Sequence, residues 1–356
     1  MKSKILVAIS GGVDSAVVAA LLKKQGYEII GVHLKFWHEN FQPENSDKLP
    51  ENKCCSLEAS EAARSVAEKL KIPFYVLNFR EDFKNKVVDY FLATYAKVKT
   101  PNPCVMCHRE IKFGKLLIKM KELGCEKIAT GHYARVRNKK LMRGIDTEKD
   151  QSYFLSRLTS EKLKHILFPL GGMRKSEVKK LAKKFGFEKI GGKKESQGTC
   201  FFPEKEPRDF LLRNLPRKLL QPGKIRTTDG KVVGGHRGLP LYTIGQRRGV
   251  ELGGMSEPYF VAGFELKKNE LIVAPDRELF TKSLKAKNLS WSGESPKDEA
   301  KMLAQIRYRS PAASGKIFFR KTRAVFEFTQ AQRAITPGQT IAFYRGQTCL
   351  GNGEIC

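Results

Sequence analysis

The sequence lacks several features that would assign it to other classes of protein. No apolar run approaches the roughly 18 residues of a membrane-spanning helix, and the apolar stretch at the N-terminus is too short for a signal-peptide core. It contains neither internal repeats nor low-complexity tracts. With 41% hydrophobic and 29% charged residues among 356, it is predicted to be a globular cytoplasmic protein with two or three cores.

Acidic residues are also few, and this shortage predicts an anionic partner. Lysine and arginine number 66 against 37 aspartates and glutamates, for a formal net charge of +29. Residues 1–204 hold 39 basic and 23 acidic side chains, and residues 205–356 hold 27 and 14, so both halves are basic. Nucleic acid would offset this charge through its phosphates, although a general solubility charge is the alternative.

A second Cys-x-x-Cys motif is missing, which argues against a four-ligand zinc site. Cys104 and Cys107 form one such pair, and Cys54 with Cys55 is the alternative source of two further ligands. In a long chain without a secretion signal, the eight cysteines are not expected to form a disulfide framework. Thiol chemistry, metal binding and simple burial stay open.

Strand and helix patterns alternate over roughly the first half of the chain. Strands are predicted over 4–9, 28–35, 73–78 and 127–130, and helices over 17–22, 56–70, 82–97, 108–123 and 176–185. This order is typical of an α/β protein with a Rossmann-like parallel sheet, predicted here over residues 1–204.

After Pro203 the strands become short and turn residues frequent. Hairpins are predicted around Asp229-Gly230 and Lys268-Asn269. We predict a small mixed domain over 205–280 and a C-terminal antiparallel β-barrel domain over 281–356.

A glycine-rich loop, residues 10–15, follows the first strand and opens the first helix. Gly11 and Gly12 allow a tight curl, so that free N–H groups at the helix start point at one anion. Ser10 and Ser15 add hydroxyl donors, and Asp14 could hold Mg²⁺ on bound phosphates. The loop is neither a Walker A motif nor a dinucleotide turn. It resembles the pyrophosphate loop of the ATP-pyrophosphatase superfamily, which implies cleavage of ATP to AMP and pyrophosphate.

Residues 100–113 form a second dense motif. Two prolines are expected to bar a regular helix before Cys104, so a helix is predicted to start near Cys107, where its dipole would favour the thiolate. Cys200 follows the small residues of 196–199, a predicted mobile loop, and is the candidate second thiol. For the pair Cys104 and Cys107, the alternatives are half of a zinc site and two ordinary loop cysteines.

Taken together, the motifs resemble those of the bacterial tRNA-specific 2-thiouridylase family over essentially the whole chain. They lie at residues 10–15, 100–113, 130–134, 149–155, 196–201, 239–249, 307–309 and 335–339. The resemblance implies that ATP adenylates the C2 oxygen of the wobble uridine in tRNA, and that sulfur arrives as a persulfide on Cys200. Cys107 is then the nucleophile: it releases sulfide from Cys200, or the persulfide attacks C2 directly. AMP leaves, and a Cys107–Cys200 disulfide remains. A cysteine desulfurase or relay protein would supply the sulfur.

The same resemblance implies three groups of contacts. ATP would be bound by Ala8, Ile9, Ser10, Gly11, Gly12, Val13, Asp14, Ser15, Leu34 and Gly131. The target base would face Asn102, Pro103 and Cys104. Anticodon-loop tRNA contacts would come from His132, Lys149, Asp150, Gln151, Arg307, Tyr308 and Gln339. By residue type alone, Leu34 could be core and His132 a packed histidine. The segment 242–250, rich in glycine and arginine, is predicted to shape tRNA recognition.

Cys104 departs from the aspartate that many relatives carry at this position. Three thiols, Cys104, Cys107 and Cys200, could therefore meet, and an iron–sulfur cluster held by them is an alternative hypothesis. Two rival functions also stay open. One is another tRNA-modifying ligase with this loop, and the other is a basic tRNA-binding protein with a non-catalytic loop.

Overall fold

The computed structural model describes residues 3–39, 56–188, 190, 199–252, 254–255 and 257–356. Cys54, Cys55 and the predicted mobile stretch 196–198 lie outside the described residues. Among the helices described, none is both long and apolar enough to cross a bilayer.

The N-terminal region contains a five-stranded sheet in the order β3-β2-β1-β4-β7. Its strands are β1 (Lys4–Ala8), β2 (Glu28–Lys35), β3 (Phe74–Asn78), β4 (Lys127–Ala129) and β7 (Ile166–Leu167), and every pairing is parallel. Side chains of β1 alternate between two cores, with Ile5 and Val7 on one face and Leu6 on the other. The predicted Rossmann-like sheet is confirmed.

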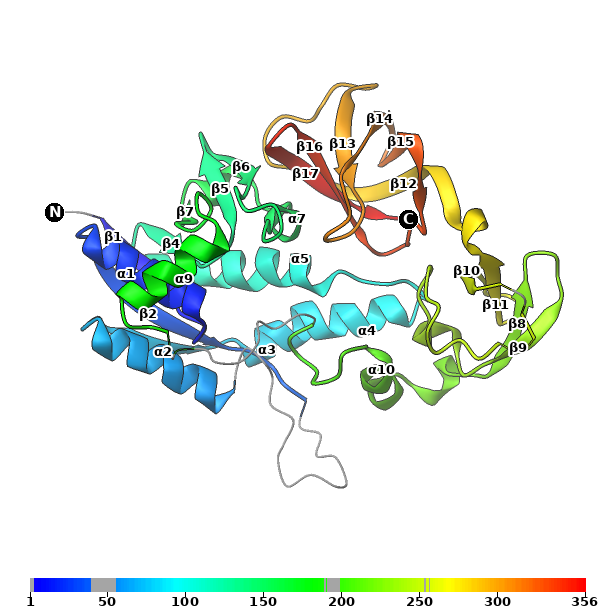
Figure 1. Ribbon diagram of the computed structural model, residues 1–356, viewed down its shortest axis with the longest axis horizontal. Coiled ribbons are helices and arrows are strands. Elements are labelled where there is room, and N and C mark those ends of the chain that lie inside the picture. The colour runs from blue at the N-terminus through cyan, green and yellow to red at the C-terminus, as the bar shows by residue number, and fades with distance from the viewer. Residues whose placement is uncertain (1–2, 40–55, 189, 191–198, 253, 256) are drawn as a thin grey trace.

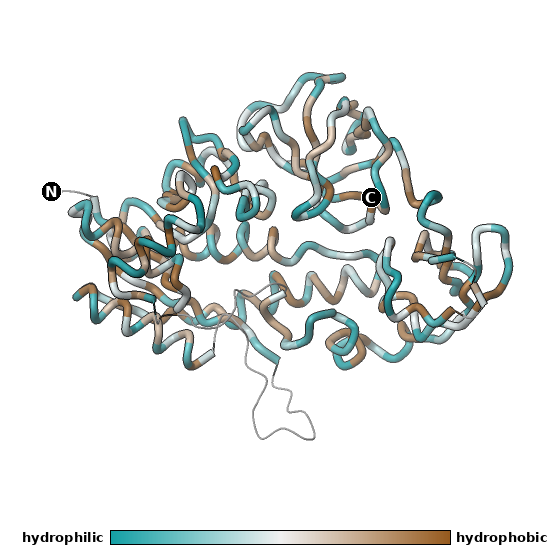
Figure 2. Tube along the Cα trace, in the orientation of Figure 1, coloured by the Kyte–Doolittle hydropathy of each residue, from teal (hydrophilic) through white to brown (hydrophobic). Residues whose placement is uncertain are grey.

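Helices cover both faces of this sheet (Figure 1). The core that contains Ile5 and Val7 also takes side chains from α1 (Val13–Lys24), α2 (Leu57–Lys69) and α9 (Lys175–Lys184). Behind the other face runs a long helical stretch of α3 (Arg80–Phe83), η1 (Lys84–Val88) and α4 (Asp89–Tyr95). Figure 2 shows hydrophobic and hydrophilic residues alternating along these helices, as one-sided burial requires.

The cysteine helix begins earlier than predicted. It runs through α5 (Pro103–Cys107), η2 (His108–Lys115) and α6 (Leu116–Glu122), and the Asn102 side chain caps it by accepting from the Val105 N–H at 3.3 Å. Pro103 occupies the first helical position, where a missing N–H costs nothing. The predicted start near Cys107 was therefore wrong. Cys104 lies in the first turn, and Cys107 lies one turn further along.

The central region forms a small mixed sheet in the order β10-β11-β8-β9. Its strands are β8 (Gly223–Thr227), β9 (Val232–His236), β10 (Tyr259–Glu265) and β11 (Glu270–Pro275). Both predicted hairpins are antiparallel, whereas β11 pairs with β8 in parallel. The helix α10 (Arg208–Asn214) connects this sheet to the α4 face through the aromatic contact of Phe210 with Phe91, whose ring centroids are 5.9 Å apart.

The C-terminal strands close into the predicted barrel. They are β12 (Phe280–Trp291), β13 (Lys301–Gln305), β14 (Ala313–Arg320), β15 (Arg323–Arg333), β16 (Thr340–Arg345) and β17 (Thr348–Ile355), and the β12–β17 pairing closes the ring. A hairpin of the N-terminal region that we did not predict, β5 (Ala134–Arg137) and β6 (Lys140–Arg143), adds to the barrel sheet through β17. The barrel is thus fixed over α5 (Figure 1).

Candidate active site

The glycine-rich loop has the geometry of an anion cradle. Gly11 has a φ of +82°, and a Cβ there would lie 2.3 Å from the Ala59 carbonyl oxygen, so only glycine fits. The Ser15 hydroxyl accepts from the Ser10 N–H at 3.1 Å and donates to the Gly12 carbonyl at 2.9 Å. α1 then starts at Val13 after Gly12, which has no side chain to cap it. The N–H groups of the first turn are therefore available to phosphate oxygens.

Asp14 is held by two groups that the sequence analysis missed. The ammonium of Lys175 lies 2.7 and 2.8 Å from the two carboxylate oxygens, and the Tyr133 hydroxyl donates to one of them at 2.9 Å. Lys175 is the first residue of α9 and only 9% exposed. A lysine at a helix start opposes the helix dipole. That unfavourable position is the sequence signal that could have identified it.

One short segment, residues 130–134, connects this loop to the cysteine helix. At Gly131 a Cβ would meet the Ser15 nitrogen at 3.1 Å, so the backbone packs directly on the loop. The next residue, His132, reaches the cysteine helix, and Tyr133 reaches back to Asp14. The candidate ATP loop and the candidate thiol helix are therefore parts of one site.

A buried pair of histidines forms the contact between this segment and the cysteine helix. His108 Nδ1 must carry a proton, because it bonds the Cys104 carbonyl oxygen at 2.6 Å and that oxygen only accepts. His108 Nε2 then accepts from His132 Nε2 at 2.8 Å, and His132 Nδ1 accepts from the Thr130 hydroxyl at 2.7 Å.

Both rings are neutral at physiological pH. Burial lowers the pKa of His108 to about 3. Burial, reinforced by the neighbouring His108, holds the pKa of His132 well below its usual range. His132 is 9% exposed and bonded on both ring nitrogens, which favours its interpretation as a packed histidine over a tRNA contact.

The barrel holds the chain just before the cysteines. The Gln339 amide donates to the Pro101 and Thr100 carbonyl oxygens at 2.9 and 3.2 Å. The Tyr153 hydroxyl donates to the Thr340 carbonyl at 2.8 Å and receives a 3.5 Å contact from the Asn102 amide. Gln339 therefore has an internal partner, and Asn102 serves as a helix cap in this structure.

The two candidate catalytic thiols share one apolar cluster. Cys107 is 5% exposed and belongs to the cluster behind β2, and the half-buried Cys200 packs against it. Next to Cys200, Phe201 anchors this part of the chain, with its ring centroid 5.1 Å from that of Phe91. Leu34, 8% exposed, is core in the same cluster.

The described Cys, His, Asp and Glu side chains gather into no group of three or more that could hold a metal ion. Cys104, Cys107 and Cys200 thus do not fit an iron–sulfur cluster as arranged here.

Other candidate tRNA residues have different surroundings. Asp150 accepts from Arg143 and from the Gly144 N–H, both at 2.9 Å, and Gln151 accepts from the Tyr133 N–H at 2.9 Å, so both brace the fold. The Lys149 backbone N–H bonds the Asp146 side chain at 3.3 Å. The ring of Tyr308 packs against that of Phe154, with centroids 4.3 Å apart and ring planes tilted by 39°.

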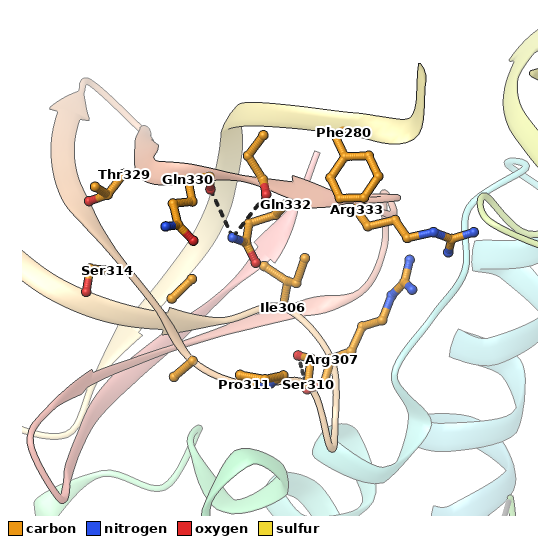
Figure 3. A pocket seen from close by; sticks show the side chains of 13 residues that line it. Phe280, Ile306, Arg307, Ser310, Pro311, Ser314, Thr329, Gln330, Gln332 and Arg333 are labelled. Atoms are coloured by element: carbon orange, nitrogen blue, oxygen red, sulfur yellow. Dashed lines mark hydrogen bonds between the residues drawn. The ribbon is translucent and has the colours of Figure 1, made fainter. Parts of the chain in front are cut away.

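Arg307 lies at the edge of a barrel cavity of about 660 Å³. Figure 3 shows its side chain and that of Arg333 extending from the barrel in the same direction. Burial and the nearby Arg333 lower the pKa of Arg307.

Comparisons with known proteins agree with this architecture. Family models described as "tRNA methyl transferase HUP domain", "tRNA methyl transferase PRC-barrel domain" and "Aminomethyltransferase beta-barrel domain" match residues 3–204, 208–275 and 281–355. The first of them groups this sheet and its glycine-rich loop with HUP-type α/β domains.

The curated relatives match over the whole chain. The tRNA-specific 2-thiouridylase MnmA of Moorella thermoacetica is 46% identical over 98% of this chain and 98% of its own. The proteins of the same name from Heliobacterium modesticaldum and Carboxydothermus hydrogenoformans are each 43% identical, over 100% and 99% of this chain and 93% and 98% of theirs. The chain belongs to the tRNA-specific 2-thiouridylase family.

Proposed function

We propose that this protein is a tRNA-uridine 2-sulfurtransferase that forms AMP and pyrophosphate. The observation that supports it best is the segment 130–134, whose Gly131, His132 and Tyr133 contact both the glycine-rich loop and the cysteine helix. A reaction that adenylates an oxygen and then replaces it with sulfur needs a nucleotide loop and thiols within one site. The curated relatives carry the name of this activity.

In the first step, ATP is bound by the residues of the loop. N–H groups from Gly11 to Ser15 hold the phosphates, and Gly131 closes the site at the Ser15 end. Lys175 and Asp14 would both act on the negative charge of the ATP phosphates. The Lys175 ammonium would neutralise phosphate oxygens, and the Asp14 carboxylate would hold Mg²⁺. Bound Mg²⁺ would neutralise the leaving pyrophosphate. The attacking C2 oxygen of uridine takes the AMP group, and pyrophosphate leaves.

In the second step, sulfur replaces the activated oxygen. In one route, the Cys107 thiolate attacks the inner sulfur of a Cys200 persulfide and hydrosulfide is released. The hydrosulfide then attacks the activated C2 carbon of the uridine. In the other, the terminal persulfide sulfur attacks C2, and Cys107 then attacks the Cys200 sulfur to release the thiolated base. Both routes expel AMP and leave a Cys107–Cys200 disulfide, so that the two thiols supply the two electrons that reduce the persulfide sulfur.

The substrate and partners follow from the same proposal. The tRNA anticodon loop would approach the cysteine helix, with Asn102, Pro103 and Cys104 at the target base. Arg307 and Lys149 would contact its phosphates, and Tyr308 would contact a base. A cysteine desulfurase or a sulfur-relay protein would load Cys200. Because mature tRNAs are used in the cytoplasm, the enzyme would work there. No step is assigned to an iron–sulfur cluster, and assays for iron and acid-labile sulfide after anaerobic purification test for one.

Mass spectrometry of tRNA nucleosides tests the proposal. The protein is incubated with MgATP, a tRNA with a wobble uridine and a persulfide source, and 2-thiouridine is expected. Cys107→Ser and Cys200→Ser should abolish it, whereas Cys356→Ser at the C-terminus should not. Release of pyrophosphate that depends on tRNA, gives no 2-thiouridine and is unchanged in both thiol variants would favour another ligase of this superfamily. Binding of tRNA without pyrophosphate release would indicate a non-catalytic binding protein. A methylated base would instead indicate the methyltransferase activity that the family-model descriptions name.

A further inference from the structure

We propose that Cys104 and Cys107 act as a redox dithiol that removes the disulfide from Cys200 after each sulfur transfer. This inference rests on the proposed function and goes beyond it. It gives a role to a third thiol that the sulfur-transfer chemistry does not require. It also explains how Cys200 becomes a free thiol that can accept a new persulfide before the protein is reduced. The disulfide bond is then held by Cys104 and Cys107.

The placement of the two cysteines on one helix supports the proposal. Cys104 and Cys107 both lie in α5 (Pro103–Cys107), three residues apart, so their side chains leave the same face. Residues at this spacing have Cβ atoms about 5–6 Å apart. A disulfide requires about 3.5–4.5 Å. Formation of a Cys104–Cys107 bond therefore draws the two Cβ atoms closer by about 1–2 Å, a movement of the first turn against its contacts with Asn102 and His108.

The two thiols also differ in exposure in the way that a relay requires. Cys107 is 5% exposed and faces the apolar cluster against which Cys200 packs, whereas Cys104 is half-buried. Passing the disulfide from Cys107–Cys200 to Cys104–Cys107 moves it towards the start of the helix. There an external reductant reaches the Cys104 sulfur without entering the cluster.

The first turn is held in place for this exchange. The Asn102 side chain bonds the Val105 N–H at 3.3 Å, and the His108 ring bonds the Cys104 carbonyl oxygen at 2.6 Å. Cys104 is thus fixed one turn from the sulfur it would attack. A thiol held at this range competes with external thiols through its high effective concentration.

The exchange is balanced. The Cys104 thiolate attacks the Cys107 sulfur of the Cys107–Cys200 disulfide, a Cys104–Cys107 bond forms, and Cys200 leaves as a thiolate that takes up the proton lost by Cys104. No net oxidation occurs in this step. An external dithiol then reduces Cys104–Cys107 and is itself oxidised to a disulfide. These exchange steps bring only two of the three thiols together at a time, whereas a metal cluster would require all three at once.

Disulfide mapping after a single turnover tests the proposal. Full-length protein with a persulfide on Cys200 reacts once with MgATP and tRNA in the absence of reductant, is alkylated at low pH, and is digested for mass spectrometry. The Cys104–Cys107 peptide should exceed the Cys107–Cys200 peptide by roughly tenfold or more, with Cys200 alkylated. A Cys107–Cys200 disulfide that persists with Cys104 alkylated would overturn the proposal.

A matched variant separates the exchange from any effect of Cys104 on the chemistry. In Cys104→Ser, each mole of 2-thiouridine formed should be accompanied by one mole of disulfide. All of that disulfide should join Cys107 to Cys200. Oxidation of the wild type with one equivalent of diamide, without tRNA, gives a readout that does not depend on thiolation. Cys104–Cys107 should dominate there too, and Cys107–Cys200 in its place contradicts the relay. If no 2-thiouridine forms but diamide gives Cys104–Cys107, the proposed function fails and the dithiol stands.

Discussion

At the scale of single residues, the contact between Asp14 and Lys175 is the feature that most changes the picture of the ATP site. The loop motif alone identified Asp14, but its partner comes from a helix more than 160 residues further along the chain, with Nζ–Oδ distances of 2.7 and 2.8 Å. Spacing in the sequence cannot reveal such a pair. Only the parallel sheet, which brings α9 beside α1, puts the two together.

Lys175→Met should raise the KM for ATP in pyrophosphate release. Loss of the ammonium removes a charge-assisted hydrogen bond of about 1.5–3 kcal/mol, which corresponds to about tenfold or more in ATP affinity. Lys184→Met on the same helix, where the lysine is exposed, is the matched control and should leave the KM unchanged. An unchanged KM in Lys175→Met would show that the lysine serves only the fold.

The histidine pair predicts a dependence of stability on pH. The pKa of His108 is about 3 in the folded protein, against 6.5 in the unfolded chain, so the unfolded state binds more protons between these values. The stability is complete above pH 6.5 and is lost as the pH falls towards 3. At pH 5, His108 alone should cost about 2 kcal/mol of the free energy of unfolding.

Urea unfolding at pH 7.5 and pH 5 measures this dependence. His108→Gln should flatten it by about 2 kcal/mol, and His165→Gln, at a half-buried position away from the site, should not. Equal pH dependence in the wild type and in His108→Gln would contradict the assignment of a neutral buried ring.

At the scale of elements, the loop between β1 and α1 shows what local sequence can predict. Its two glycines were identified from their place between a strand and a helix, and Gly11 does adopt a conformation that favours glycine. The start of the cysteine helix shows the limit of such reasoning. Two prolines suggested a break, yet Pro103 is well accommodated at the first helical position once Asn102 caps the helix. The cap and the proline act together, so neither could be interpreted alone.

Replacement of Gly11 and of Gly12 by alanine should change the free energy of unfolding by different amounts. Gly11→Ala forces a left-handed φ of +82° and a contact 2.3 Å from a backbone oxygen, so unfolding should become easier by more than about 1 kcal/mol. Gly12 has a φ of −93° and its nearest neighbour would be 3.5 Å away, so Gly12→Ala should be neutral or slightly stabilising. Denaturant unfolding without nucleotide provides the comparison, and equal losses in the two variants would refute the cradle geometry.

At the scale of the whole molecule, the barrel and the N-terminal sheet are joined by contacts that no local pattern predicts. The β5–β6 hairpin pairs with β17 over the Leu141–Cys349 and Met142–Thr348 positions, more than 200 residues apart in the chain. The sequence analysis predicted the barrel and the sheet separately, from their own periodicities. Their docking is decided by the shapes of folded surfaces, and so it became visible only in the structure.

The net charge of +29 predicts a steep salt dependence of tRNA binding. Counterion release by several phosphate contacts should weaken affinity by orders of magnitude between about 50 and 200 mM salt. Arg307→Gln should reduce the slope of log Kd against log salt concentration by about 1, which corresponds to the loss of one phosphate contact. Filter binding at a series of salt concentrations measures both. A flat response of the wild type would mean that the charge serves something other than tRNA.

The central claim is that the C2 oxygen of uridine leaves on AMP and that sulfur from the protein takes its place. A tRNA whose wobble uridine carries ¹⁸O at C2 tests it most directly, with mass spectrometry of both products. The account predicts ¹⁸O in the phosphate of AMP and one AMP for each 2-thiouridine formed. Thiolated tRNA accompanied by AMP without ¹⁸O, or by no AMP at all, would contradict it.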